Sequence, residues 1–165
     1  MKRFPCGKYG RQTLEFCAAP FRAPLRAFAA LVIPWSGENV LICHIEDRGW
    51  CVPSGRVEPG ESSLEAARRE AMEESGASLK EIHYMGCYRV TQRSEVRWID
   101  LYTANVVSLC DLDPKFESTA RKYVTVDELP EIYHLWNPLM ECVFKHSKEV
   151  LMRHEAMKEC LDCGE

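Results

Sequence analysis

Three glutamates in the middle of the chain, Glu70, Glu73 and Glu74, have a spacing that lets them act together on a cation. Residues three and four apart lie on one face of a helix, so this spacing brings the three carboxylates side by side. The same geometry directs Arg68 and Arg69 elsewhere, and three like charges repel one another unless something neutralises them. Mg²⁺ takes a few carboxylate oxygens, keeps some waters and completes its shell with substrate phosphates. The cluster predicts a metal site for phosphate chemistry, with a solvated acidic helix face as the alternative.

The cluster belongs to a longer motif, GRVEPGESSLEAARREAMEESGA, which runs from Gly55 to Ala77. Its spacing resembles the Nudix box, and every polar and glycine position of that box is present: Gly55, Glu61, Arg69, Glu70, Glu73, Glu74 and Gly76. The chain departs from the family pattern just before the box. Relatives often have Pro-Gly-Gly there, whereas this chain has Pro53-Ser54-Gly55.

The resemblance implies a hydrolase that uses Mg²⁺, with Mn²⁺ as a substitute, to cleave a phosphoanhydride bond in a nucleoside diphosphate-linked substrate. By the family pattern Glu70, Glu73 and Glu74 hold the metal, and the backbone carbonyl of Ser54 is a further ligand. One of these glutamates, or a glutamate from a loop, is the general base. Glu117, in a loop shortly before the last expected strand, is favoured for that role over Glu95.

The other box residues are expected to support these groups rather than to react. Arg69 is expected to pair with the carboxylates and orient them, a contact that is common around metal ligands. Glu61 is expected to tie the loop to the helix, and Gly55 and Gly76 are structural positions of the box.

The substrate is predicted by elimination. Accessory residues that mark ADP-ribose, diadenosine polyphosphate and NADH enzymes after the box are absent, which leaves a MutT-type enzyme acting on nucleoside triphosphates. Asn137 stands where MutT-type relatives carry a base-reading Asn, but Asn is also a good helix N-cap. The alternatives are a nucleotide-sugar or dinucleotide pyrophosphatase of the ADP-ribose or ApnA type, and a non-catalytic Nudix-fold nucleotide-binding regulator.

Composition limits the partners. The chain has 165 residues and a net charge of −4, which argues against stable nucleic-acid binding because such binding needs clustered positive charge. The longest apolar stretch, Ala27 to Pro34, is too short to span a bilayer. We therefore expect a cytoplasmic protein with a small-molecule nucleotide substrate and no membrane partner; a homodimer is left open.

The elements that must position the motif follow from local patterns. Apolar, β-rich runs predict strands at 27–34, 39–46, 50–52, 82–90, 98–107 and 121–126, with a hairpin turn at Ser36 to Glu38 and a charged loop from Thr91 to Arg97. Good helix formers predict a helix from Ser62 to Ser75 that stops at Gly76 and buries Leu64, Ala67 and Ala71. A second, amphipathic helix is expected from Pro138 to about Lys158.

This order predicts an α/β protein of the α+β type, with a mixed β-sheet sandwiched between helices. The resemblance implies the Nudix fold. We expect an N-terminal extension at 1–26, the Nudix hydrolase domain at 27–158 and a C-terminal tail at 159–165.

Nine cysteines without a secretory signal indicate free thiols. Cys43, Cys51, Cys87 and Cys110 lie in or beside apolar runs and are expected to be buried. Cys160 and Cys163 have the two-residue spacing of a zinc knuckle, yet no second pair matches them, so a tail with two thiols is favoured over zinc.

Overall fold

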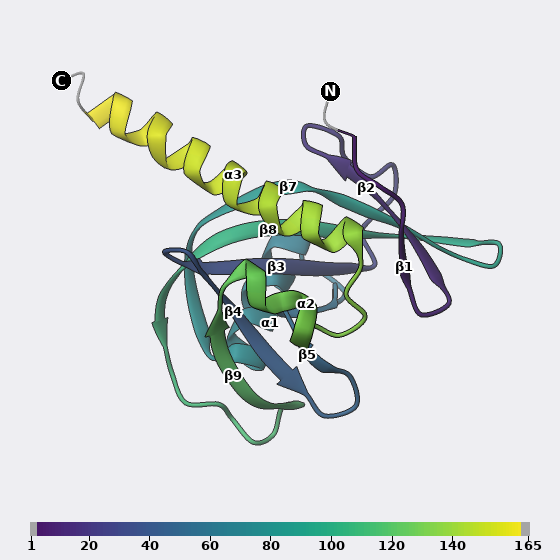
Figure 1. Ribbon diagram of the computed structural model, residues 1–165, viewed down its shortest axis with the longest axis horizontal. Helices are drawn as coiled ribbons and strands as arrows, with labels where there is room; N and C mark the ends of the chain where they lie inside the picture. Colours follow the sequence, from purple (N-terminus) through teal and green to yellow (C-terminus); the bar gives the residue numbers. More distant parts are fainter. Residues whose placement is uncertain (1–2, 163–165) are drawn as a thin grey trace.

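The computed structural model describes residues 3–162, which form one nine-stranded mixed sheet with helices on both faces (Figure 1). The strand order is β1-β2-β7-β8-β3-β4-β5, with β6 paired to β3 and β9 paired to β4. The strands are β1 (Gly7–Tyr9), β2 (Gln12–Ala18), β3 (Ala29–Ser36), β4 (Asn39–Ile45), β5 (Gly49–Cys51), β6 (Ser54–Arg56), β7 (Ala77–Gln92), β8 (Glu95–Leu109) and β9 (Ser118–Val124). The helices are α1 (Ser63–Ser75), α2 (Leu129–Ile132) and α3 (Pro138–Asp162), with a short 3₁₀ turn, η1 (Val126–Glu128). The predicted α+β architecture is confirmed.

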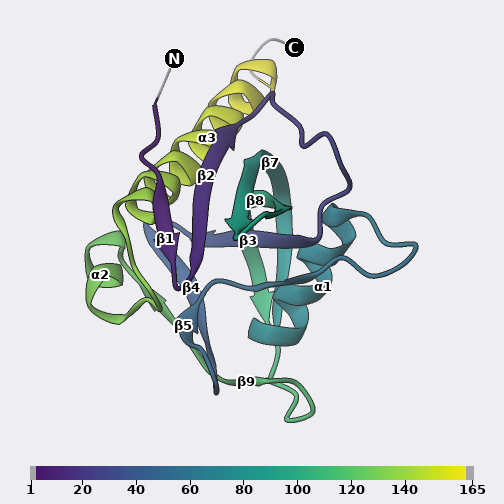
Figure 2. The same cartoon turned by 90° about the vertical axis from the view of Figure 1, so that its right-hand side faces the viewer.

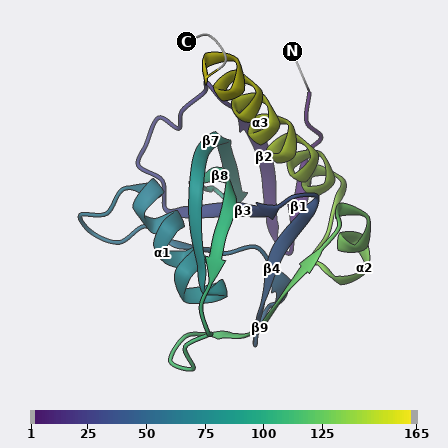
Figure 3. The same ribbon diagram turned by 90° about the vertical axis from the view of Figure 1, so that its left-hand side faces the viewer.

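Strand β3 separates the two layers of the core, and it runs parallel to β8. Ala30 and Val32 lie in the cluster on the α1 side, whereas Ile33 and Trp35 lie in the cluster on the α3 side. This alternation follows from the two-residue period of a strand. Figures 2 and 3 show α1 and α3 on opposite sides of β3, β7 and β8.

Helix α1 packs on the sheet through small residues. Ala66, Ala67 and Ala71 are fully buried, but Leu64, which was expected in this stripe, is 38% exposed. The helix is rotated so that alanines face the strands, and their short side chains let the helix backbone lie close to the sheet. This rotation also brings Glu70 and Glu74 to the buried edge of the helix.

The predicted strands 82–90 and 98–107 are parts of one long hairpin. Strand β7 continues to Gln92 and β8 starts at Glu95, so the expected charged loop shrinks to a two-residue turn at Arg93 and Ser94. Arg93 has a positive φ of 55°, as such tight hairpin turns require. The residues near this turn are polar, yet they continue the β7–β8 pairing, because an antiparallel sheet can expose one face to water.

The first 26 residues contain two strands that sequence patterns did not predict. Strand β2 pairs antiparallel with β7, with Leu14 opposite Val90 and Phe16 opposite Tyr88. Leu14 and Phe16 are buried and flank the exposed Glu15, so the alternation of a half-buried strand is present in the sequence. The expected boundary at residue 27 stays a prediction.

Helix α3 lies across the sheet and extends beyond it (Figure 1). Leu139, Val143, Phe144 and Leu151 are buried on the face of the helix that packs on the sheet. The helix continues to Asp162, past the predicted end near Lys158. Within residues 3–162, no helix is both long and apolar enough to cross a membrane.

Candidate active site

Helix α1 begins and ends at residues that fix its position along the chain. The Ser62 hydroxyl accepts a hydrogen bond from the Glu65 N–H (3.1 Å), and the Glu65 carboxylate accepts one from the Ser62 N–H (2.7 Å), which together form a capping box. At the other end Gly76 adopts a left-handed conformation with φ of 64°. Because both ends are fixed, the direction of each glutamate on the helix is fixed as well.

Arg69 joins three carboxylates on this side of the helix. Its Nε donates to Glu61 (2.8 Å), and its Nη1 donates to Glu70 (2.8 Å) and to Glu73 (3.3 Å). Arg69 thus pairs with the carboxylates, as the resemblance implies, and the other expectation, that the helical geometry directs it away from the cluster, is wrong because the long side chain bends back over them. These contacts hold the pKa of Glu61 below its ordinary value, with the Arg69 hydrogen bond as the main cause.

The Glu70 carboxylate rests directly on the backbone of Gly55. A Cβ atom added at Gly55 would overlap that carboxylate, so any larger residue would displace it. Burial raises the pKa of Glu70, and the hydrogen bond from Arg69 opposes the rise. The glycine at this box position therefore has a steric reason: it leaves room for a buried carboxylate.

Glu74 is the most buried carboxylate of the cluster, with 7% of the residue exposed. Its Oε2 accepts a hydrogen bond from the Ser54 N–H (3.0 Å), and its Oε1 lies 3.7 Å from Nη2 of Arg48. Burial raises the pKa of Glu74 to about 7, although the Ser54 hydrogen bond and Arg48 both favour the charged form. Carboxyl groups with such raised pKa values are concentrated at functional sites.

These groups line one open cleft of about 550 Å³, which we call the carboxylate cleft. It is bounded by β6, by the α1 glutamates Glu70, Glu73 and Glu74, and by the loop residues 115–117. Glu117 lies in the cleft wall, as its favoured assignment requires. Glu95 lies at the exposed end of the β7–β8 hairpin, where it pairs with Arg97 at 3.4 Å.

The donor set of the cleft suits a hard divalent cation. It consists of carboxylate oxygens and the backbone of Ser54, which are the ligands that Mg²⁺ prefers. Among residues 3–162, no group of three or more His, Cys, Asp or Glu side chains already converges on one point. Arg69 instead forms ion pairs with Glu70 and Glu73. The cleft thus has the type of ligand that the cation prefers, but these side chains would have to rearrange to bind it.

Asn137 is the N-cap of α3. Its Oδ1 accepts a hydrogen bond from the Met140 N–H (3.1 Å), and its Nδ2 donates to the Lys8 carbonyl (2.9 Å). Both the oxygen and the nitrogen of the Asn137 amide therefore have partners within the protein. Asn137 also does not line the second cavity, which lies beside the carboxylate cleft. This geometry favours the capping alternative; base reading by Asn137 stays a prediction.

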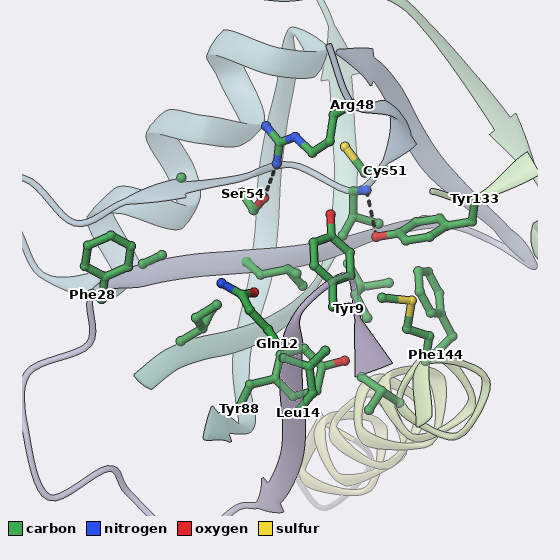
Figure 4. A pocket seen from close by; sticks show the side chains of 18 of the residues that line it. Tyr9, Gln12, Leu14, Phe28, Arg48, Cys51, Ser54, Tyr88, Tyr133 and Phe144 are labelled. Atoms are coloured by element: carbon green, nitrogen blue, oxygen red, sulfur yellow. Dashed lines mark hydrogen bonds between the residues drawn. The ribbon is translucent and has the colours of Figure 1, made fainter. Parts of the chain in front are cut away.

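A second cavity, of about 280 Å³, opens beside the carboxylate cleft, and we call it the apolar pocket (Figure 4). Its walls are mostly aromatic and aliphatic side chains, which come from both ends of the chain and from the sheet: Tyr9, Leu14, Phe28, Tyr88, Met140 and Phe144. Arg48, Ser54, Gly55 and Arg56 line both cavities. The pocket and the cleft thus share a wall.

Sequence patterns missed Tyr9, Gln12 and Arg48 in this site. Tyr9 and Gln12 belong to the unpredicted N-terminal strands, for which the alternation of Leu14 and Phe16 was the available signal. Arg48 lies in the short turn between β4 and β5, and its Nη1 donates to the Ser54 hydroxyl (3.4 Å). A lone arginine in a turn carries no local signal, because its role depends on strands that fold together.

Among the cysteines, Cys43, Cys51 and Cys87 are buried as expected, but Cys110 is exposed at the end of β8. Cys160 is exposed near the end of α3, and Cys163 lies outside the described residues. Of the eight described free cysteines three are buried, and none of the eight lines the carboxylate cleft.

Comparison with known proteins matches residues 24–145 to the model of the NUDIX domain. YtkD of Bacillus subtilis (strain 168), a proposed 8-oxo-dGTP diphosphatase, is 39% identical over 95 residues, which are 58% of this chain and 59% of that protein's length. The crystal structure of a mutant of the B. subtilis pyrophosphohydrolase BsRppH is 28% identical, covers 93% of this chain and 98% of its own, and has a TM-score of 0.73. A NUDIX hydrolase from Nitrosomonas europaea shares the fold over 76% of this chain and 90% of its own, with 22% identity and a TM-score of 0.62. The complete box on α1, the cleft it forms and the family match together place this chain in the Nudix hydrolase family.

Proposed function

We propose that this protein is an Mg²⁺-dependent nucleoside triphosphate pyrophosphohydrolase. The observation that carries the proposal is the shared wall between the apolar pocket and the carboxylate cleft, formed by Arg48 and by β6. A nucleotide has the same two-part character, with an apolar, flat base at one end and a charged polyphosphate at the other. A base in the pocket would direct the phosphates across Ser54 and Arg56 toward the α1 glutamates.

The oxygen donors of the cleft support a bound divalent cation. Glu70, Glu73, Glu74 and the carbonyl of Ser54 would hold it. When bound, Mg²⁺ neutralises phosphate charge and makes a nearby water more acidic. Arg48 and Arg56 add positive charge at the mouth of the cleft, where they can attract and orient the polyphosphate. Their position between the two cavities suits the phosphates nearest the sugar.

In the reaction, water adds to a phosphorus atom, the phosphoanhydride bond breaks, and a nucleoside monophosphate, pyrophosphate and a proton are released. Glu117 is the proposed general base, because it lies in the cleft wall and belongs to a loop opposite the α1 glutamates. Burial and hydrogen bonds already hold Glu70 and Glu74, which suits them to binding rather than to proton transfer.

The name of the relative YtkD points to an oxidised purine triphosphate, so purine triphosphates and 8-oxo-dGTP belong first in a substrate screen. We expect pyrophosphate release from at least one nucleoside triphosphate with Mg²⁺, and none in EDTA. Hydrolysis of ADP-ribose or a dinucleoside polyphosphate, with no triphosphate cleaved, would show that the substrate class is wrong. Binding of nucleotides without any hydrolysis would support the regulator alternative.

A further inference from the structure

The apolar pocket has one carboxamide among its described wall residues, and that group belongs to Gln12. Its side chain is directed into the cavity (Figure 4). Asn137, the other amide considered for base contact, does not line this pocket and bonds Met140 and Lys8 through its two polar atoms. Gln12 is therefore the amide that the described pocket wall offers to a ligand.

The backbone fixes this direction. Gln12 pairs with Tyr9 across the two-residue turn at Gly10 and Arg11, so the two side chains share a face of the hairpin. Leu14, two residues further along β2, lies on the same face and is buried in the pocket wall. Turning Gln12 outward would require a one-residue slip of β2 that would also expose Leu14.

The Gln12 amide keeps hydrogen-bonding capacity for a ligand. Its Nε2 donates one long bond, of 3.3 Å, to Oε1 of Gln92, which leaves a second N–H and the carbonyl oxygen. Two other polar groups in the wall already have partners: the Tyr133 hydroxyl accepts from the Val52 N–H (3.1 Å), and the Ser54 hydroxyl accepts from Arg48. The Tyr9 and Tyr88 hydroxyls also belong to the wall, but Gln12 alone places a donor beside an acceptor on one planar group in this mostly apolar surface, an arrangement that gives a pocket its specificity.

We infer that Gln12 reads the edge of the nucleobase and sets the base preference of the enzyme, an inference that rests on the proposed function. Aromatic walls such as Phe28 and Tyr9 can stack on any base and discriminate little. A carboxamide pairs with an edge that presents one donor and one acceptor, such as the adenine amino group and N7. A base that presents the wrong pattern would form fewer hydrogen bonds with the half-buried amide.

Two substitutions separate this role from a structural one. Gln12→Met keeps the length of the side chain and removes both hydrogen-bonding groups, so the ratios of kcat/KM among ATP, GTP, CTP and UTP should move toward one by ~10–100-fold, mainly through KM. Gln12→Glu replaces the donor with a second acceptor. A carboxylate accepts two hydrogens, which guanine supplies through N1–H and its 2-amino group and adenine does not, so the GTP to ATP ratio should rise by roughly tenfold.

The control is Gln92→Met, which removes the protein partner of Gln12 and lies outside the pocket wall. Its base ratios should stay within about threefold of wild type, and all three variants should melt like wild type. Equilibrium binding of AMP and GMP, measured without metal, gives the same comparison without catalysis. Ratios in folded Gln12→Met equal to those of wild type, or a wild type that treats all four bases alike, would overturn the inference. If wild type cleaves no triphosphate, the proposed function is wrong, and the monophosphate affinities still decide the role of Gln12.

Discussion

The burial of Glu74 predicts a measurable conflict between stability and function. Its pKa is about 7, against an ordinary value of 4.5, because burial disfavours the charged form. Below pH 4.5 the carboxyl is protonated in both the folded and unfolded states. As the pH rises toward 7 the unfolded chain loses this proton and the folded chain keeps it, so the folded state becomes less stable over that window. Above pH 7 the loss is complete and amounts to about 3 kcal/mol.

Glu74→Gln removes this titration and keeps the shape of the side chain, including an oxygen that can accept the Ser54 N–H. In EDTA the variant should therefore gain stability over wild type as the pH rises, by about 2.5 kcal/mol between pH 5 and pH 8. Urea unfolding followed by tryptophan fluorescence at both values measures the two free energies. The difference between variant and wild type cancels the contributions of other titrating groups.

The matched control is Glu131→Gln, at an exposed position on α2, which should leave the pH dependence unchanged. A gap between wild type and Glu74→Gln that stays constant within about 0.5 kcal/mol from pH 5 to pH 8 would refute the reasoning. In that case Glu74 would be ionised in the folded state at low pH, and Arg48 would compensate fully for its burial.

Three further predictions concern the same site. Glu73→Gln should fold normally and lower kcat by ~100-fold or more with Mg²⁺, and wild-type turnover that is equal in EDTA and in Mg²⁺ would contradict the metal assignment. Gly55→Ala should lower kcat by about 100-fold, because the added Cβ displaces the Glu70 carboxylate; retained activity would show that Glu70 can move without consequence. Asn137→Ala should cost ~1 kcal/mol in urea unfolding through loss of the cap and leave the base preference unchanged, whereas altered base ratios would restore Asn137 as a base-reading residue.

Helix α1 could be predicted from local spacing, because the residues that define it all lie within a few helical turns. Ser62 and Gly76 mark the two ends, and the three glutamates between them follow from the helical period. The same reasoning failed for Arg69 and Leu64. A helical wheel gives the direction of a Cβ atom, but it does not tell where a long side chain ends or how far the helix rotates against its sheet.

The apolar pocket could not be predicted from local sequence patterns, for a different reason. Gln12 reaches it only because β2 pairs with β7, and the paired residues of the two strands are about 70 positions apart in the chain, from Thr13 with Thr91 to Ala18 with Gly86. Register between such distant strands depends on the packing of the whole sheet. Arg48 and Glu117 likewise meet at the cleft because β4 pairs with β9, a contact that no short motif specifies.

The hydrogen bond between Lys8 and Asn137 joins positions 129 residues apart, at the wall where β1 meets α3. During synthesis on the ribosome, the box helix emerges and can fold around its glutamates long before Met140 and Phe144 are made. A nascent chain, or one shortened before Met140, would therefore contain the carboxylates but would have an incomplete apolar pocket. Under the proposed function, proteolytic removal of β2 or of the first turns of α3 would have the same effect, giving a species that keeps its glutamates and loses the pocket for the base.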